Sequence, residues 1–342
     1  MKILISGGGG FLGSQIIKQG HQSATLPNAK FISLARNYYS ELENFEVQQI
    51  QVDLSASKAG HIIKNKIAVG EVDLLIHTAA KAGIWGSYSD YFQQNVVATQ
   101  NILQIGMDLK ISKMIFTSTP SVMFSTKNIT DADENLSYPE DYLNYYAQTK
   151  SMAEKYFFDF IKKNNIQGLA LRPHLLFGEN DPHILPRLYQ KAVKGRLWQV
   201  GRGENLVDVT PIEDAAVAHL LACEKLMNDP EPINGKAFFI AGQNPVLLWD
   251  FIKEFLGYVN INQNLKIMPF KLAYTLGFVF EKIYALLGIA KQEPPMTRFV
   301  ACQMGLDHYF KHEEVKKLLG HEPRTSISAA LKKAANHYTK KQ

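Results

Sequence analysis

The apolar positions in the first half of the chain form short runs that alternate with segments of helical spacing. The runs predict buried strands at Lys2–Ser6, Lys30–Ala35, Val47–Val52, Val72–His77, Lys113–Thr117 and Gly168–Leu171. Helical spacing recurs near residues 11–19, 59–67, 88–107 and 142–163. Apolar strands that alternate with helices predict a doubly wound α/β fold, in which helices cover both faces of a parallel sheet.

The pattern changes after about residue 175, where seven prolines between Pro173 and Pro245 divide the chain into shorter pieces. Helical spacing continues near residues 184–194, 213–226, 248–257, 270–288 and 327–338. We therefore predict two regions. Residues 1–175, with a return segment at about 205–240, form the sheet domain. Residues 176–342, mainly 176–204 and 241–342, form a smaller, mainly helical region that binds substrate.

A glycine-rich segment, SGGGGFLG at residues 6–13, joins the first predicted strand directly to the first predicted helix. In this context Gly7 permits a tight turn, Gly10 lets the backbone approach a pyrophosphate, and Gly13 lets the helix pack close to the strand. The helix N-terminus presents free N–H groups to the phosphates. A flexible surface linker would not follow a buried strand directly, so we predict a Rossmann dinucleotide site. Larger residues are expected to be accepted at Gly8 and Gly9, which lie between the motif positions.

The end of the second strand bears on which dinucleotide binds. An acid roughly 20 residues beyond the glycines binds the adenosine ribose 2′-hydroxyl in NAD-binding folds. Here that position is Ala35, and Arg36 follows it. A cation without the acid suits a 2′-phosphate, so NADP(H) is favoured over NAD(H); the alternative for Arg36 is an ordinary arginine of a surface loop.

Further candidates lie at the ends of the next strands. Asp53 is placed where its side chain could reach adenine. Thr78, Ala79 and Ala80 are small enough to leave room for the cofactor's ribose and phosphates. A structural role is favoured for His77.

A tyrosine and a lysine four residues apart, Tyr146 and Lys150, lie on one face of a predicted helix. The lysine ammonium and an oxidised nicotinamide would favour the phenolate and lower the pKa of Tyr146, so this side chain can exchange a proton with a ketone or alcohol. Neither Tyr142 nor Tyr145 has a lysine four residues on. Thr119 would bring a hydroxyl to the same edge of the sheet, and Ser118 and Ser121 are close alternatives. For all three residues the other interpretation is a purely structural role in a turn before Pro120.

Composition narrows the class of protein. The chain has 342 residues, 46% of them apolar and 20% charged, and a formal net charge of +5. That charge suits an anionic cofactor but lacks the clustering of a nucleic-acid binder. Cys223 and Cys302 have no metal-ligand spacing, so we expect two buried, reduced thiols and no metal. The start of the chain has no signal-peptide pattern and no apolar stretch is long enough to span a bilayer, so we expect a cytoplasmic protein.

Together, the glycine motif, the strand end at Thr119 and the pair Tyr146/Lys150 resemble an extended short-chain dehydrogenase/reductase. The segments NVVATQNIL (95–103), LRPHLLFGEND (171–181) and LLGHEPRTSISAAL (318–331) are similar to later landmarks of that family. HTAAKAGIWGSYSDY, FTSTPSV, HILPRL and RFVACQM are similar to its 3β-hydroxysteroid dehydrogenase/isomerase branch, and within it to the bacterial 2-alkyl-3-oxoalkanoate reductases of long-chain olefin synthesis.

The resemblance implies roles for individual residues. Thr119, Tyr146 and Lys150 match the catalytic positions, although serine is commoner than threonine at the first. Lys150 would also hold the nicotinamide ribose, Pro173 would lie against the nicotinamide, and Asn95 would pack near the site. The residues predicted to contact the cofactor are Gly7, Gly10, Phe11, Leu12, Gly13, Arg36, Asp53, Leu54, Thr78, Ala79, Ala80, Asn95, Thr117, Tyr146, Lys150 and Pro173.

The resemblance also implies reduction of the 3-keto group of a hydrophobic 2-alkyl-3-oxoalkanoic acid. The segment 269–290 places Leu272, Leu276, Phe280, Ile283 and Leu287 on one helical stripe. A second apolar face carries Tyr274, Phe278 and Ala285. The stripe would face the substrate, a partner protein or a membrane surface; alternatively the helix is buried on all sides. Trp85 could form part of the wall of the substrate pocket. The candidate residues for binding the substrate carboxylate are Lys81, His174, His183 and Arg187.

Other functions remain open at this level. A 3β-hydroxysteroid dehydrogenase uses the same reacting groups. A sugar-nucleotide epimerase or dehydratase would need basic residues for a second pyrophosphate, for which Arg187 and Arg202 are candidates, but the apolar 270–290 helix argues against it. A non-catalytic NADP-binding sensor is a different class. In many family dimers the helices at 88–107 and 142–163 form a four-helix bundle, so we expect a homodimer. A complex with other enzymes of the pathway and peripheral membrane contact are further expectations.

Overall fold

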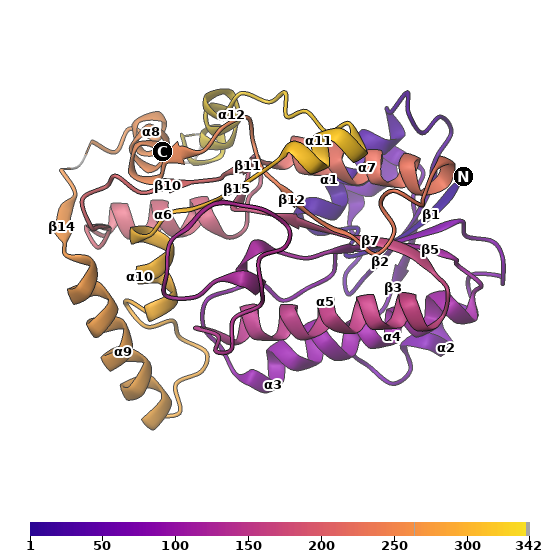
Figure 1. Ribbon diagram of the computed structural model, residues 1–342, viewed down its shortest axis with the longest axis horizontal. Coiled ribbons are helices and arrows are strands. Elements are labelled where there is room, and N and C mark those ends of the chain that lie inside the picture. The colour runs from indigo at the N-terminus through magenta and orange to yellow at the C-terminus, as the bar shows by residue number, and fades with distance from the viewer. Residues whose placement is uncertain (263, 340–342) are drawn as a thin grey trace.

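A computed structural model describes residues 1–262 and 264–339 (Figure 1). Residue 263 and residues 340–342, which the predicted second region includes, lie outside this description. The main sheet has seven parallel strands in the order β12-β7-β5-β4-β1-β2-β3. Their bounds are β1 Lys2–Ser6, β2 Lys30–Ala35, β3 Gln48–Gln51, β4 Leu74–His77, β5 Lys113–Thr117, β7 Gln167–Pro173 and β12 Ala237–Ile240.

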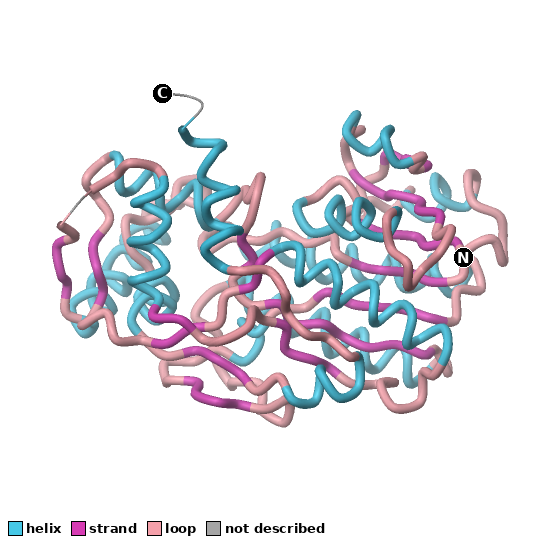
Figure 2. The backbone as a smooth tube through the Cα atoms, turned by 90° about the horizontal axis from the view of Figure 1, so that it is seen from above, coloured by secondary structure: helices cyan, strands magenta, loops and turns pink. Residues whose placement is uncertain are grey.

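Helices cover both faces of this sheet, as Figures 1 and 2 show. Along β1, Ile3 and Ile5 pack into one core and Leu4 into the other, which is why the strand is apolar at every position. Around the first core lie α1 Phe11–His21, α7 Ile212–Asn228 and α11 Glu313–Leu319. Around the second lie α2 Ala59–Lys64, α4 Ala98–Asp108 and α5 Tyr145–Lys163. The predicted doubly wound fold is therefore confirmed.

Some boundaries differ from the sequence prediction. The seventh strand, β12, was not among the six predicted strands. The predicted helix at 88–107 consists of α3 Tyr88–Tyr91, the π-helix η2 Phe92–Val97 and α4. Helix α5 starts three residues later than its predicted bound, because the Asn144 side chain accepts a hydrogen bond from the Ala147 N–H and caps it.

The C-terminal region is mainly helical but also contains short strands that apolar spacing did not predict. Its helices are α6 Ile184–Val193, α8 Leu248–Tyr258, α9 Phe270–Leu286, α10 Arg298–Gly305 and α12 Ile327–Thr339. One small sheet has the order β13-β10-β15-β6, with β13 Val246–Leu247, β10 Leu206–Val207 and β15 His308–Phe310. Its edge strand, β6 Ile129–Ala132, comes from the first region. Two pairs are β14 Lys266–Met268 with β9 Trp198–Val200, and β11 Thr210–Pro211 with β8 Leu176–Phe177. The 3-10 helices η1 Ser40–Phe45 and η3 Pro120–Met123 complete the assignment.

Helix α9 corrects one alternative from the sequence. Its buried residues are Ala273, Gly277 and Glu281, not the large apolar ones. A Cβ on Gly277 would lie 2.5 Å from the carbonyl carbon of Thr297, so this small-residue face packs directly against the segment that begins α10. The alternative prediction, that this helix is buried on all sides, is therefore wrong. None of the helices that the structure describes has the length and hydropathy that crossing a bilayer would require.

Candidate active site

The turn after β1 shows why glycine is needed at positions 7 and 13, and how Gly10 closes the turn. Gly7 has φ +75°, a conformation that favours glycine. The Gly10 N–H then donates to the Gly7 carbonyl at 2.8 Å and closes the turn. A Cβ on Gly13 would lie 2.2 Å from that same carbonyl oxygen, so only glycine lets α1 start this close to the strand.

The start of α1 fits the pyrophosphate of a dinucleotide. The first helical hydrogen bond runs from the Ser14 N–H to the Gly10 carbonyl at 2.9 Å, so the N–H groups of Phe11, Leu12 and Gly13 precede the helical ladder. The N-cap residue is a glycine and the first turn carries no acidic residue. The helix end therefore keeps its positive potential for an anion.

The intervening glycines correct the expectation that larger residues are accepted there. A Cβ on Gly8 would lie 2.4 Å from Oγ of the buried Ser33, and one on Gly9 would lie 2.1 Å from the ring of Tyr39. Ser33 lies on β2 and Tyr39 follows it, so the second strand and its loop close over the glycines. A side chain at either position would have to displace these neighbours.

Beyond β2 and β3 the structure brings Arg36 and Asp53 near one another. Asp53 accepts hydrogen bonds from the Ser55 N–H at 2.9 Å and the Ser55 hydroxyl at 2.7 Å. The Ser55 hydrogen bonds hold the pKa of Asp53 below its usual value, and the charge of Arg36 adds to this. Both side chains are exposed at the sheet edge, where the adenosine end of the cofactor was predicted. Leu54 is buried and its carbonyl accepts a hydrogen bond from Asn101.

The end of β4 is anchored by hydrogen bonds to β1. Thr78 donates its hydroxyl to the Ser6 carbonyl at 2.7 Å, which leaves Ala79 and the exposed Ala80 beside the glycine turn. His77 is buried between the hydroxyls of Ser6 and Thr99, at 2.6 and 2.9 Å. Burial, and then the charge of Lys150, lower the pKa of His77 to about 3, so its ring is neutral. The structural role favoured for His77 is confirmed.

The structure separates Tyr146 from its two neighbouring tyrosines. Tyr145 points outward and is exposed, with its ring 5.5 Å from that of Tyr88. Tyr142 donates its hydroxyl to Ser151. Tyr146 instead lies on the inner side of α5, with its ring 6.5 Å from the buried Tyr91 and its phenol beside Thr119. Of the three, it is the one placed at the predicted site.

Lys150 lies one turn beyond Tyr146 and is buried. Its Nζ donates to the Thr117 carbonyl at 2.7 Å and lies 4.2 Å from the centre of the Phe116 ring. Burial lowers the pKa of Lys150 to about 7, against the opposing charge of Glu154. Thr117 thus meets the site through its carbonyl, because its hydroxyl pairs with His219 Nε2 at 2.8 Å on the α7 side of the sheet.

The lowering expected for the Tyr146 pKa required both the Lys150 ammonium and an oxidised nicotinamide, and the groups of the chain itself give the opposite direction. Burial raises the pKa of the phenol, and the hydrogen bond with Thr119 is the opposing influence. The physical reason is that Lys150 directs its ammonium to the Thr117 carbonyl and shares the same desolvated site. In this arrangement Tyr146 is protonated near neutral pH, which suits a proton donor.

Thr119 is held in position by a local turn. Its side chain caps η3 by accepting from the Ser121 N–H at 3.2 Å, and its hydroxyl donates to Ser121 Oγ at 3.3 Å. The extended backbone at Thr119 follows β5 directly, so the hydroxyl emerges at the C-terminal edge of the sheet. Ser121 supports Thr119, and both are buried.

Two further predicted residues occupy defined places around these groups. Asn95 is buried in η2 and binds the Lys81 backbone on both sides, accepting from its N–H at 2.7 Å and donating to its carbonyl at 3.1 Å. It therefore positions the loop after β4. Pro173 ends β7 beside Ile240 of β12, at the same edge of the sheet as Thr119.

A buried ion pair below Lys150 was missed by sequence reasoning. Glu154 accepts from Arg172 Nη2 at 2.7 Å and Nε at 3.0 Å, and from the Tyr138 hydroxyl. The exposed fractions are 0% for Glu154 and 3% for Arg172. The available signal was the spacing, since Tyr146, Lys150 and Glu154 follow one another at four-residue intervals on α5.

The substrate side is built by segments distant in sequence. Tyr91 donates its hydroxyl to the Trp85 carbonyl at 3.1 Å, and Lys81 lies over its ring. Arg187 of α6 pairs with Glu293 at 3.1 Å. Burial raises the pKa of Tyr91 to about 12; the charges of Glu293 and Tyr146 add to this rise and that of Arg187 opposes it. Arg187 and Glu293 therefore lie near Tyr91, on the same side of the site as Tyr146.

The four candidate partners of a substrate carboxylate separate in the structure. The prediction that His174 binds the substrate carboxylate is wrong. This side chain is buried and hydrogen-bonded to His308 at 2.7 Å, and burial holds its pKa well below the usual value. His183 is exposed at the start of α6. Lys81 and Arg187 are the two that adjoin Tyr91. Trp85 donates to the Ile289 carbonyl at 2.9 Å, so the loop after α9 borders this side.

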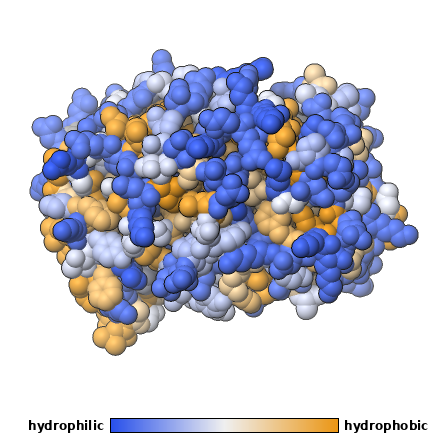
Figure 3. Space-filling model, in the orientation of Figure 1, coloured by the Kyte–Doolittle hydropathy of each residue, from blue (hydrophilic) through white to orange (hydrophobic). Residues whose placement is uncertain are grey.

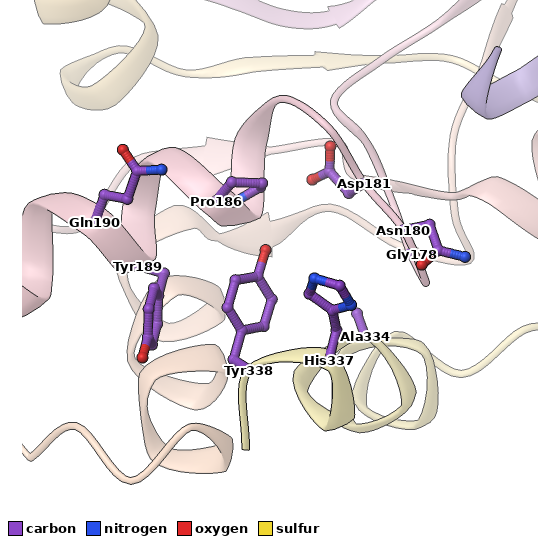
Figure 4. Close-up of a pocket in the computed structure, with 9 residues that line it drawn as sticks. All are labelled: Gly178, Asn180, Asp181, Pro186, Tyr189, Gln190, Ala334, His337 and Tyr338. Carbon is purple, nitrogen blue, oxygen red and sulfur yellow. The ribbon is translucent and has the colours of Figure 1, made fainter. Parts of the chain in front are cut away.

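A separate cavity of about 400 Å³ lies between α6 and α12 (Figure 4). Figure 4 shows Tyr189, Tyr338, His337 and Asp181 around it, and none of Thr119, Tyr146 or Lys150 lines it. Asp181 caps α6 there by accepting three backbone N–H groups. Elsewhere, both cysteines are free and buried. In residues 1–262 and 264–339 no three His, Cys, Asp or Glu side chains are grouped to hold a metal.

Comparison with known proteins gives consistent relationships. The sequence model of the 3-beta hydroxysteroid dehydrogenase/isomerase family matches residues 4–272. A 2-alkyl-3-oxoalkanoate reductase of Shewanella oneidensis is 36% identical over 335 residues, which cover 96% of this chain and 84% of that protein. A sterol-4-alpha-carboxylate 3-dehydrogenase (decarboxylating) of Mus musculus is 28% identical, over 98% and 91% of the two chains.

The fold also resembles solved structures. The dTDP-glucose 4,6-dehydratase DesIV of Streptomyces venezuelae, solved with NAD and TYD bound, matches with a TM-score of 0.77. The two chains are 17% identical, and the match covers 99% of this chain and 97% of the other. At this identity the likeness describes the fold alone.

Proposed function

The chain belongs to the 3-beta hydroxysteroid dehydrogenase/isomerase family and is an NAD(P)-dependent oxidoreductase, and from this premise we propose that it uses NADPH to reduce the 3-keto group of a hydrophobic 2-alkyl-3-oxoalkanoic acid. The observation that carries the proposal is the convergence of Thr119, Tyr146 and Lys150 at the C-terminal sheet edge, beside Tyr91. The identity with a reductase named for this substrate supports the substrate class.

The chemistry divides between cofactor and protein. When bound, the nicotinamide supplies a hydride to the ketone carbon. Thr119 donates a hydrogen bond to the ketone oxygen, and Tyr146 transfers its phenolic proton to that oxygen as negative charge develops. The product is the 3-hydroxy acid, and the phenolate that remains is reprotonated from solvent. Lys150, held by the Thr117 carbonyl, would orient the nicotinamide ribose.

A coupled assay at the nicotinamide absorbance band tests this proposal. We expect NADPH oxidation with 2-alkyl-3-oxoalkanoic acids and little with steroids or UDP-sugars. Tyr146→Phe should lose almost all turnover and still bind NADPH, with Tyr145→Phe as the matched control that retains activity. Oxidation of a 3β-hydroxysteroid without reduction of any 3-keto acid would replace this proposal with a steroid dehydrogenase, and Tyr146→Phe with unaltered behaviour would indicate a sensor.

We further propose that Arg36 selects NADP(H). Arg36 follows β2 where an acid would otherwise bind the ribose hydroxyl, and it lies close enough to Asp53 to affect its pKa. A guanidinium can bind the 2′-phosphate with two parallel hydrogen bonds. Arg36→Ala should reduce kcat/KM for NADPH and leave that for NADH nearly unchanged. Wild-type preference for NADH would refute this assignment.

For the substrate carboxylate we propose Arg187, which adjoins Tyr91 and is half-exposed in its pair with Glu293. Arg187→Met should raise KM for the 3-keto acid and have little effect on the methyl ester of the same compound. Arg202→Met, a second arginine of the region, is the control. An equal change for acid and ester would assign Arg187 to the fold instead.

We also propose that the protein is a homodimer through α3, α4 and α5. Tyr88, Tyr145 and Met152 form an exposed cluster on these helices, in which the Tyr88 hydroxyl lies 3.8 Å from Met152 Sδ. Light scattering should give twice the chain mass for the wild type and a smaller particle for Met152→Lys. Val193→Lys, at an exposed position on α6, should leave the mass unchanged.

A further inference from the structure

Helix α9 presents large apolar side chains to solvent. The exposed ones are Leu272, Phe278, Val279, Ile283, Leu286 and the adjoining Leu287. Leu286 is 88% exposed and Leu287 65%. Apolar side chains gather at the lower tip of the surface in Figure 3, where Figure 1 places α9. A continuous exposed stripe of this kind marks an interaction surface, unlike isolated apolar residues.

The packing of α9 explains why this stripe stays outside. Ala273, Gly277 and Glu281 form the face that meets the protein, and Glu281 binds Arg298 at 2.7 Å. Leu272, Val279, Ile283 and Leu286 follow helical spacing on a different side. Because small residues make the internal contact, α9 lies close to α10 while its long side chains point away from the body.

The charges around the stripe indicate the chemistry of its partner. Exposed lysines flank it at 266, 271, 282 and 291. The acidic residues of positions 264–293 are Glu281, which is buried and paired with Arg298, and Glu293, which is paired with Arg187. The exposed charge of this segment is therefore positive. Trp198 and Ile267 are further exposed apolar side chains of the β9–β14 pair that leads into α9, and Lys266 lies over the Trp198 ring.

We propose that α9, together with the β9–β14 edge, docks the protein on the surface of an anionic phospholipid bilayer. The helix lies in the plane of the interface, with its leucines and Ile283 among the acyl chains and the lysines at the headgroups. A fluid bilayer accepts flexible aliphatic side chains without a complementary rigid shape, and its anionic headgroups match the four lysines.

The placement of α9 gives docking a functional meaning that rests on the proposed function. Tyr284 of α9 packs edge-on against Trp85, and the Ile289 carbonyl accepts the Trp85 indole N–H. Trp85 in turn belongs to the loop that holds Tyr91 beside Tyr146. Docking by α9 would therefore bring the substrate side next to the membrane, into which an alkyl-chain acid partitions.

Vesicle sedimentation with the full chain tests docking independently of any substrate. We expect binding to phosphatidylcholine vesicles that contain phosphatidylglycerol, weaker binding to phosphatidylcholine alone, and loss of binding at high salt. Leu286→Ser/Leu287→Ser should lower the partition coefficient at least about tenfold for each leucine. Lys271→Glu/Lys282→Glu should lower binding to the vesicles that contain phosphatidylglycerol and leave binding to pure phosphatidylcholine vesicles unchanged. Val69→Ser and Lys66→Glu, exposed positions near α2, are the matched controls.

The substituted side chains are exposed, so the variants should unfold at the same denaturant concentration as the wild type. A loss of vesicle binding can then be assigned to the surface and not to unfolding. Failure of the wild type to bind anionic vesicles, or equal binding by the leucine variant, would overturn the proposal. A leucine variant that changes a dimer into a monomer, with no vesicle binding by the wild type, would assign α9 to an interface between two copies. Vesicle binding without reductase activity would leave docking supported and reject the proposed function.

Discussion

The ion pair between Glu154 and Arg172 offers a sharp test of how the site is supported. Replacing Arg172 with methionine keeps an unbranched side chain but leaves the Glu154 carboxylate buried with Tyr138 as its remaining side-chain donor of the three hydrogen bonds. Removal of one member of a buried pair costs about 3–5 kcal/mol, because the other charge stays desolvated. We expect Arg172→Met to lower the free energy of unfolding by about this amount.

The assay is urea unfolding at neutral pH with two comparison variants. Lys64→Met removes an exposed pair, Lys64–Asp108 at 2.8 Å, and should cost no more than about 1 kcal/mol. Glu154→Gln/Arg172→Met carries no buried charge and should recover much of the loss. A penalty for Arg172→Met as small as that for Lys64→Met would refute the reasoning.

The pH dependence supplies a second criterion. Burial would raise the pKa of Glu154, but the hydrogen bonds and charge of Arg172 outweigh this and hold the pKa below its usual value. A lowered folded-state pKa stabilises the fold above the unfolded pKa, and this contribution is lost as pH falls through the folded value. In Arg172→Met burial alone raises that pKa, so the penalty should be largest at neutral pH and shrink on acidification. A penalty that does not change with pH would contradict the assignment to a buried charge.

Two further predictions concern the cofactor. Gly13→Ala places a Cβ 2.2 Å from the Gly7 carbonyl oxygen and should weaken NADPH binding at least about tenfold in a fluorescence titration, whereas Gly257→Ala, on a helix with open space around it, should leave binding unchanged. The pKa of Lys150 is about 7, so kcat/KM for NADPH should fall as the pH rises through that value and the ammonium is lost. Lys150→Arg, whose guanidinium does not titrate there, should remove this inflection; its persistence would assign the inflection to another group.

Much of the main sheet could be predicted because its strands carry their signal locally. Strands β1, β2 and β5 have the predicted bounds, since each is a continuous apolar run buried on both faces. The short strands were missed for the opposite reason. Lys266–Met268 pairs with Trp198–Val200, far away in sequence, and neither has a pattern of its own.

The candidate site was predictable to a similar degree. The turn at Gly7, Gly10 and Gly13 follows from neighbours in sequence, whereas the crowding of Gly9 depends on Tyr39 beyond the next strand. Spacing places Tyr146 and Lys150 on one helical face. It does not reveal that burial raises the pKa of Tyr146, or that His174 is buried against His308.

The sequence by itself determined the fold class, the glycine turn after β1 and the one-turn separation of Tyr146 from Lys150, because these depend on backbone geometry over a few residues. Only the tertiary structure decided where Lys150 directs its ammonium, which arginine neutralises Glu154 and which face of α9 is buried. These contacts join segments far apart along the chain. Which of these contacts form depends on how closely two surfaces can pack, and Gly277 permits such a close approach for α9. It also depends on which charged groups lose their contact with water when they are buried.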